Sequence, residues 1–245
     1  MSVFKDKGVV LKEYFSGEYD KNLVLLLKDR GKVTVFAKGA RRPKSKYNAG
    51  SQALAYCEFV IFEGKGFLSL TQTEVISSFY YIGRDYDKLC LASYFAEIVN
   101  ATILSSMPAS DPLLLLLMSL KALAKGIMHN ELISSIFGIK YMQIEGYSPQ
   151  LDKCVICEED QKHGAKLYFT DHGIICSQCA ESGCDSFIEI DEKVIFVMDY
   201  ILNNEIKKIF KISVSEEVTD KLHRAVQFFI KANLDVTTKS GKFIK

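Results

Sequence analysis

The sequence predicts a multidomain α+β protein in which a small five-stranded barrel precedes an α-helical bundle carrying a zinc knuckle. Three observations predict this fold. The hydrophobic pattern repeats every two residues in roughly the first third of the chain, it then changes to a helical period, and four cysteines form two matched CxxC pairs late in the chain. With 245 residues, 48% of them hydrophobic, the chain is long enough for two modest domains. We place them at residues 1–80 and 81–245, with the zinc-binding insertion at 150–185.

Five segments rich in β-branched, aromatic and aliphatic residues predict the strands. They are Gly8 to Phe15, Asn22 to Lys28, Lys32 to Lys38, Ala55 to Glu63, and Gly66 to Thr73. In the third segment Val33, Val35 and Ala37 share one face, because side chains alternate along a strand, and Phe36 lies on the other. One long connection, residues 39–53, suits a closed barrel such as an OB-fold. An SH3-like barrel is the alternative, since periodicity does not separate the two.

The helical period begins after about residue 83. One buried stripe is expected to hold Leu89, Ala92, Phe95, Val99 and Ile103. Capping residues predict the starts of further helices. These starts are the Asp111-Pro112 pair, Asn130, Asp191, and a capping box formed by Ser213 and Glu216. The second of these helices runs from Asn130 until Gly146 closes it ahead of Pro149.

The two cysteine pairs, Cys154-x2-Cys157 and Cys176-x2-Cys179, are separated by 18 residues. Two x2 turns can direct four thiolates at one tetrahedral ion, so the spacing predicts a zinc site. Four cysteines close the coordination sphere, which favours a structural site over a catalytic one. Disulfides or free core thiols are the alternative interpretation. Other residues are weaker candidates: His163 and His172 could replace a cysteine, and Cys57, Cys90 and Cys184 are interpreted as packed or spare thiols.

The compartment bears on the cysteine chemistry. The first residues, MSVFKDKGVV, contain no apolar signal segment, and the longest apolar run, Leu113 to Met118, is far too short to span a bilayer. We therefore expect a cytoplasmic protein. Thiols stay reduced in the cytoplasm, where paired CxxC turns hold metal more often than they form disulfides.

The charge is distributed unevenly along the chain. The net charge is +1, yet residues 1–80 carry 13 Lys and Arg against 8 Asp and Glu, which leaves 18 against 22 for the rest. Between residues 28 and 46 eight basic residues face one acid, Asp29. The basic residues are Lys28, Arg30, Lys32, Lys38, Arg41, Arg42, Lys44 and Lys46. Nucleic-acid phosphates are a natural partner for this cluster, although basic loops are often only solvated.

Two aromatic residues accompany the basic loop KGARRPKSK. Phe36 on the third strand and Tyr47 just past the loop are candidates for stacking bases. The alternative for Phe36 is a core ring. The sequence contains no Walker loop, GxSxG, HExxH or GxGxxG motif, so a binding protein is favoured over an enzyme.

The order of these parts resembles the RecO family of bacterial DNA repair proteins over nearly the whole chain. The resemblance is carried by Gly8-Val9-Val10-Leu11, Glu18 and Asp20, Gly31, Lys38-Gly39-Ala40-Arg41-Arg42-Pro43-Lys44-Ser45, Tyr94-Phe95-Ala96-Glu97, and the knuckle opened by Cys154-x2-Cys157. It implies an OB-fold and a zinc element held by Cys154, Cys157, Cys176 and Cys179.

The resemblance also implies a function in DNA repair and recombination by the RecF pathway. Proteins of this family bind single- and double-stranded DNA and anneal complementary strands. With RecR they load RecA onto strands coated with single-strand-binding protein, whose acidic C-terminal tail is a further partner. The implied phosphate contacts are Lys38, Arg41, Arg42, Lys44 and Lys46, supported by Arg30 and Lys32. A zinc-containing protein-protein adaptor or thiol redox switch remains the alternative function.

Overall fold

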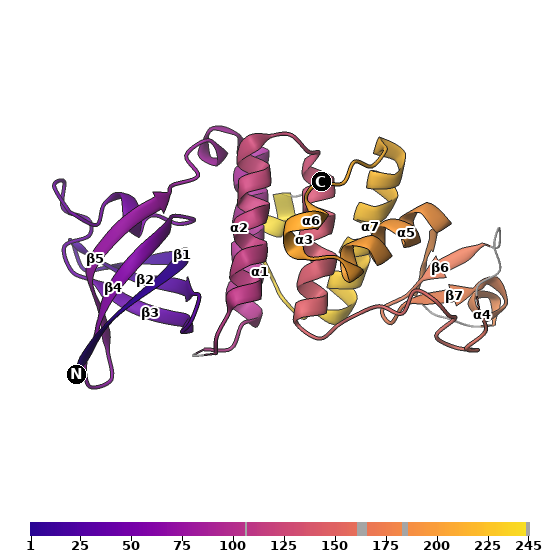
Figure 1. Ribbon diagram of the computed structural model, residues 1–245, viewed down its shortest axis with the longest axis horizontal. Coiled ribbons are helices and arrows are strands. Elements are labelled where there is room, and N and C mark those ends of the chain that lie inside the picture. Colours follow the sequence, from indigo (N-terminus) through magenta and orange to yellow (C-terminus); the bar gives the residue numbers. More distant parts are fainter. Residues whose placement is uncertain (106, 161–165, 183–185, 244–245) are drawn as a thin grey trace. The chain divides into compact units, whose positions relative to one another are not determined.

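The computed structural model describes residues 1–105, 107–160, 166–182 and 186–243 (Figure 1). His163 and Cys184, both weaker candidates for the metal site, lie outside the described residues. The chain divides into two compact units, one formed by residues 1–125 with 237–245 and the other by residues 126–236. This division differs from the predicted boundary at residue 80, because two helices pack against the barrel and the C-terminal segment packs against the first of these helices.

The first unit contains a closed barrel of five strands (Figure 1). The strands are β1 (Ser2–Ser16), β2 (Asp20–Leu27), β3 (Gly31–Ala37), β4 (Tyr56–Glu63) and β5 (Leu68–Ser77). Their order is β1-β2-β3-β5-β4, with β1 closing the barrel on β4. Because β3 pairs with β5 and not with β4, the barrel has the Greek-key order of an OB-fold, which decides against an SH3-like barrel.

The first strand starts six residues earlier than predicted. Residues 2–9 pair with β4, and the register then shifts between Val10 and Lys12 as the same strand pairs with β2. Such a bulge bends a strand, so that one long strand serves two neighbours in a closed barrel. The prediction missed this part because Lys5, Asp6 and Lys7 interrupt the hydrophobic alternation.

The barrel core confirms the predicted alternation in β3. Val35 and Ala37 are fully buried among the other inward residues, and Val33 packs against them. Phe36, which points to the opposite side, is half-buried. Tyr47 belongs to the buried core, which follows from its position directly after the basic loop, where the chain turns back over the barrel.

Two helices complete the first unit, α1 (Tyr86–Thr102) and α2 (Ser110–Lys125). Asp85 caps α1 by accepting a hydrogen bond from the Lys88 backbone N–H at 3.1 Å. The expected stripe of α1 is wrong at Leu89, which is 39% exposed. The α2 helix already begins at Ser110, so Asp111 lies in its first turn and does not serve as its N-cap.

The second unit contains α3 (Asn130–Ile144), α5 (Glu192–Asn203), α6 (Ile206–Ile209) and α7 (Glu216–Asn233). The same unit contains a small sheet of three strands, β6 (Leu167–Phe169), β7 (Ile174–Cys176) and β8 (Ile188–Ile190), in the order β7-β6-β8 (Figure 1). The short helix α4 (Ser177–Glu181) follows β7. Close packing of α3 on α7 depends on Gly138, where an added Cβ would lie 2.6 Å from a Val226 methyl group.

The predicted caps of the second unit have mixed outcomes. Asp191 caps α5 as expected, accepting from the Val194 N–H at 3.1 Å. Gly146, with φ of 94°, closes α3 as expected. The capping box of Ser213 with Glu216 is wrong, since Ser215 is the N-cap of α7 and Glu216 its first residue. Asn130 is likewise the first residue of α3, and His129 precedes it as N-cap.

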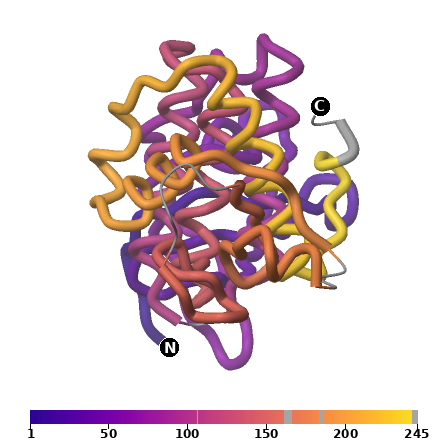
Figure 2. The backbone as a smooth tube through the Cα atoms, turned by 90° about the vertical axis from the view of Figure 1, so that its right-hand side faces the viewer, coloured from indigo at the N-terminus to yellow at the C-terminus, as the bar shows by residue number. Residues whose placement is uncertain are grey.

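The chain leaves the first unit after Lys125 and returns to it after Val236, as the colours in Figure 2 allow the reader to follow. The returning end is tied to α1. Ser240 donates two hydrogen bonds to the Glu97 carboxylate, from its N–H at 3.1 Å and its hydroxyl at 3.0 Å. This long-range contact carries no local sequence pattern, and the sequence therefore did not predict it.

Candidate nucleic-acid interface and metal centre

The basic loop follows β3 and is folded into turns. Its start is held by Gly39, whose N–H donates to the Asp20 carboxylate at 2.6 Å and whose φ of 69° suits glycine. The Arg41 N–H donates to the Tyr19 carbonyl oxygen at 2.9 Å, and the Ser45 N–H to that of Arg42 at 2.9 Å. The loop is therefore anchored on the β1–β2 hairpin.

Five of the predicted phosphate contacts lie together on this loop. Lys38, Arg41, Arg42, Lys44 and Lys46 are all exposed. Within the described parts of the chain, no carboxylate lies within ion-pair distance of any of the five. Cations without a carboxylate partner keep their charge available for an external anion.

The two arginines of the loop lie over aromatic rings of the hairpin. The Arg41 guanidinium carbon is 4.1 Å from the centre of the Phe15 ring, and that of Arg42 is 5.5 Å from Tyr19. Phe15 is 68% exposed and Tyr19 is 44% exposed. Sequence reasoning missed both rings. The two aromatic residues flank Gly17 at a hairpin turn. Side chains at such a turn lie beyond the barrel core, so large apolar residues there are not explained by packing, and this pattern could have revealed the two rings.

Tyr47 does not stack bases, contrary to the prediction. It is only 8% exposed, and its hydroxyl donates to the carbonyl oxygens of Leu70 and Thr71 at 3.1 and 3.0 Å. Its neighbour Lys46 also reaches the Thr71 carbonyl oxygen, at 2.9 Å. Both side chains therefore fasten the end of the loop to β5, although Lys46 stays exposed.

The remaining two predicted contacts, Arg30 and Lys32, do not join the loop. They lie at the start of β3, and the seven residues of that strand separate them from Lys38 by roughly 20 Å. Arg30 approaches Glu63 at 3.4 Å and the Phe4 ring at 4.1 Å. Lys32 is half-buried. The basic cluster of the sequence is thus divided between the two ends of the barrel.

The four predicted cysteine ligands come together in the second unit. The sulfur atoms of Cys154, Cys157, Cys176 and Cys179 all lie within 4.8 Å of one another. The first pair lies in a turn in which Glu158 has a φ of 60° and its N–H donates to the Cys154 carbonyl oxygen at 2.9 Å. Cys176 ends β7 and Cys179 lies in α4, so the small sheet brings the second pair to the first.

The geometry of the sulfur atoms fits a tetrahedral metal ion. The Cys157 and Cys176 sulfurs are 3.9 Å apart, far beyond a disulfide bond and close to the roughly 3.8 Å edge of a zinc tetrathiolate. Cys154 is buried, and its sulfur accepts the Cys176 N–H at 3.5 Å. Such N–H donors are the usual outer-shell partners of metal-bound thiolates.

Without a bound cation, the pKa values of the cysteine thiols differ from one another. Burial raises the pKa of Cys154, but hydrogen bonds from the backbone of Cys157, Cys176 and Ile156 outweigh it and lower the pKa to about 6. In contrast, a hydrogen bond with the neighbouring Cys176 thiol raises the pKa of Cys179 to about 12. A cation would let all four ionise together, since a coordinating thiol loses its proton.

The closed barrel with its exposed basic loop and the helical unit with its four-cysteine cluster define a multidomain α+β protein of the OB-fold class. Residues 1–79 match the family described as Recombination protein O N terminal, and residues 83–242 match Recombination protein O C terminal. The chain belongs to the RecO family of DNA repair proteins, and its role lies in DNA repair and recombination.

Curated relatives agree over the full length. The chain is 36% identical to the DNA repair protein RecO of Acetivibrio thermocellus, over 100% of this chain and 97% of the relative. It is 34% identical to that of Caldicellulosiruptor bescii, covering 100% and 99%, and 32% identical to that of Alkaliphilus metalliredigens, covering 95% and 94%. Among the described residues, the helices are too short or too polar to cross a membrane.

Proposed function

We propose that this chain is a non-enzymatic recombination mediator that binds single- and double-stranded DNA through the basic loop and anneals complementary strands. The observation that carries the proposal is the group of five exposed cations on the OB barrel of a RecO-family protein, none of which has a carboxylate partner among the described residues. With RecR, it would load RecA onto single strands coated with single-strand-binding protein. This work belongs in the cytoplasm, at the nucleoid.

The physical task in annealing is to hold two polyanions close enough for their bases to pair. Each lysine or arginine that neutralises a phosphate reduces the repulsion between the backbones and releases condensed counterions. Contacts of this kind carry no sequence information, so they serve any pair of complementary strands. No covalent step is needed.

The test replaces Arg41, Arg42 and Lys44 by alanine together. DNA affinity should fall for all sequences alike, and the slope of log affinity against log salt should become shallower by about 2 to 3. Fluorescence anisotropy with labelled single and double strands measures both quantities. Unchanged affinity and slope would remove the loop from the DNA interface.

A matched control has the same loss of charge in the other unit. Lys207, Lys208 and Lys211 are exposed, and their replacement by alanine changes the net charge equally. We expect this control to retain the salt slope of the unchanged protein. An equal loss in both triple variants would mean that total charge, and not the loop, governs binding.

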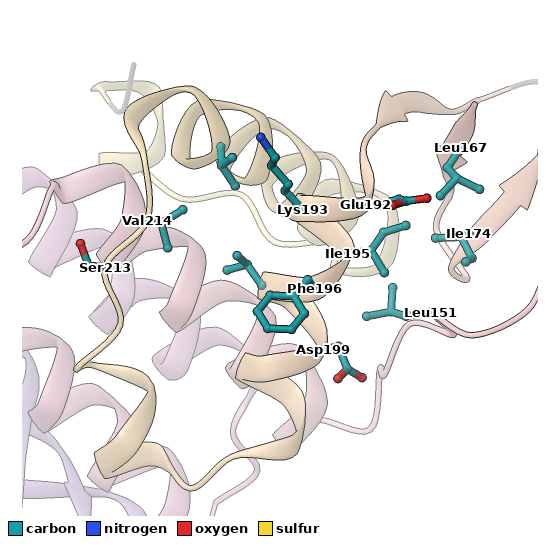
Figure 3. A pocket seen from close by; sticks show the side chains of 12 residues that line it. Leu151, Leu167, Ile174, Glu192, Lys193, Ile195, Phe196, Asp199, Ser213 and Val214 are labelled. Atoms are coloured by element: carbon teal, nitrogen blue, oxygen red, sulfur yellow. The ribbon is translucent and has the colours of Figure 1, made fainter. Parts of the chain in front are cut away.

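The acidic tail of single-strand-binding protein is expected to need an apolar pocket with a basic rim. The second unit contains a pocket of about 660 Å³ beside α5, lined by apolar residues that include Ile195 and Phe196 (Figure 3). Its charged residues are Glu192, Asp199 and Lys193, two carboxylates against one ammonium. This pocket lacks the basic rim, so we do not assign the tail to it.

The proposed ion of the four-cysteine cluster is a structural Zn²⁺, held by Cys154, Cys157, Cys176 and Cys179. When bound, it would cross-link the first turn to β7 and α4, in a segment whose own buried core is only a few residues. The alternative function, an adaptor or thiol redox switch, is favoured by one observation, the exposure of Cys157. Zinc loss and changed partner binding under mild peroxide would support the switch, whereas retained zinc with retained DNA binding would reject it.

A further inference from the structure

Two aromatic rings stand at the tip of the β1–β2 hairpin without a place in the barrel core. Phe15 is the penultimate residue of β1, and Tyr19 immediately precedes β2. Gly17, with φ of 62°, makes the tight turn between them. Phe15 is 68% exposed and Tyr19 is 44% exposed. A single exposed ring is common on a protein surface, but two rings at one turn, each beneath an arginine, form a shared aromatic and cationic surface.

The cations over these rings differ from the other arginine–ring pair of the barrel. Arg30 lies over Phe4 but is also paired with the Glu63 carboxylate, which neutralises it. Arg41 and Arg42 have no carboxylate partner in the described parts of the chain. The Arg41 side chain also donates a hydrogen bond to the Gly17 carbonyl oxygen at 3.3 Å. Weak, exposed contacts of this kind are readily exchanged for a phosphate.

One acid lies within the hairpin turn. A hydrogen bond with Glu18 raises the pKa of the neighbouring Tyr19 phenol. The other nearby carboxylate, Asp20, is already occupied by the Gly39 N–H. The surface around the two rings therefore combines neutral aromatic faces with cations that outnumber the free acid.

We propose that Phe15 and Tyr19 form a stacking subsite for unpaired bases of single-stranded DNA, while Arg41 and Arg42 move from the ring faces to the adjacent phosphates. The inference rests on the proposed function, because it requires the basic loop to lie along the strand. Every base has a flat π face, so stacking of this kind is independent of sequence. It also holds a base unpaired and exposed, which is the state that annealing needs.

The test compares two labelled oligonucleotides of equal length, oligothymidylate and an abasic strand, which have the same phosphates but differ in bases. The full chain should bind oligothymidylate more tightly. Phe15→Leu and Tyr19→Leu should each weaken oligothymidylate binding about fivefold or more, because base stacking is lost, and leave the abasic strand unchanged. Anisotropy titrations measure all of these affinities.

The control is Phe67→Leu, which removes a ring that is 54% exposed in the β4–β5 hairpin and belongs to neither the β1–β2 hairpin nor the basic loop. It should bind both strands like the unchanged protein. Phe15→Trp keeps a ring at the same place and should retain or strengthen oligothymidylate binding. This substitution gives a result even if leucine at that position destabilises the hairpin.

The outcomes separate this inference from the proposed function. If the unchanged protein binds neither strand, the proposed function fails. If it binds both strands equally well, or if the leucine variants lose equal affinity for both, the proposed function stands and the stacking subsite is rejected. In that case the rings serve another surface, such as a protein contact.

Discussion

Lys32 Nζ donates a hydrogen bond to the carbonyl oxygen of Asn100 at a distance of 2.7 Å. Asn100 lies in the last turn of α1, where carbonyl groups have no partner within the helix and the helix dipole is negative. A lysine that appeared in the sequence to belong to the basic cluster therefore links the barrel to the first helix. This contact distinguishes a structural cation from the exposed cations of the basic loop, which we propose as the DNA contacts.

Replacing Lys32 by methionine should reduce stability more than it reduces DNA binding. The variant keeps the aliphatic part of the side chain but loses the charged hydrogen bond, which is worth about 1.5 to 3 kcal/mol. Urea unfolding measures the change. Lys28→Met is the control, since the Lys28 side chain is exposed in the preceding turn and its ammonium forms a long, exposed ion pair with Asp29 at 3.9 Å. A large loss of DNA affinity in the Lys32 variant, with normal stability, would contradict the structural role.

Gly31→Ala should destabilise the first unit. An added Cβ would lie 1.9 Å from the Met107 carbonyl oxygen, and the φ of 66° disfavours any side chain. Two costs therefore combine, the left-handed backbone at about 1 kcal/mol and a clash with rigid backbone.

Gly17→Ala separates these two costs. Its φ of 62° is nearly the same, but no atom lies within 4 Å of the added Cβ. We expect it to lose only the backbone cost, so that the difference between the two variants in urea unfolding measures the clash with Met107. Equal losses would show that the segment around Met107 moves aside freely.

Cys157→Ser and Cys176→Ser should each remove the metal and lower the melting temperature. A complete tetrathiolate zinc site contributes on the order of 10 kcal/mol of apparent binding free energy, so its loss is readily visible. Metal analysis and thermal unfolding measure the two effects. Cys90→Ser is the control, because that half-buried thiol lies on α1, outside the cluster. Full metal content in both cluster variants would show that they are not ligands.

The stability of the second unit should fall as the pH drops below 7, and His223 should contribute to the fall. Burial lowers the pKa of His223 in the folded chain, while Glu131 and Asp220 partly oppose the shift. Because the unfolded state then binds more protons, this contribution is complete above the ordinary value of 6.5 and is lost as the pH falls toward the folded value.

His223→Gln should therefore show a shallower dependence of unfolding free energy on pH between neutral and mildly acidic buffers. Comparison with the unchanged protein removes the background from the cysteine cluster, which also prefers higher pH. His172→Gln, at a side chain that is 76% exposed, is the control and should leave the slope unchanged. An identical slope for His223→Gln and the unchanged protein would contradict the prediction.

The sequence predicted the features that depend on neighbouring residues. Alternation placed Val35 and Ala37 in the core, the CxxC spacing brought four sulfurs together, and Asp191 capped its helix. The prediction failed where a residue's burial or contacts depend on a partner that is distant in the sequence. Nothing near Tyr47 indicates that its hydroxyl reaches β5, and nothing near Leu89 indicates that its side of α1 is exposed. The capping box of Ser213 failed because Ser215, two residues later, offered an equally suitable start.

The sequence by itself determined the order of barrel, helices and cysteine knuckle, because hydrophobic period and ligand spacing are local properties of the chain. The tertiary structure decided which cations are available. Strand pairing placed Arg30 and Lys32 at one end of β3, beside Glu63 and Asn100, and the loop of Arg41 and Arg42 at the other, against Phe15 and Tyr19. The sequence specifies the charge of each residue. The residues that this charge contacts depend on which distant segments lie beside it in the closed barrel.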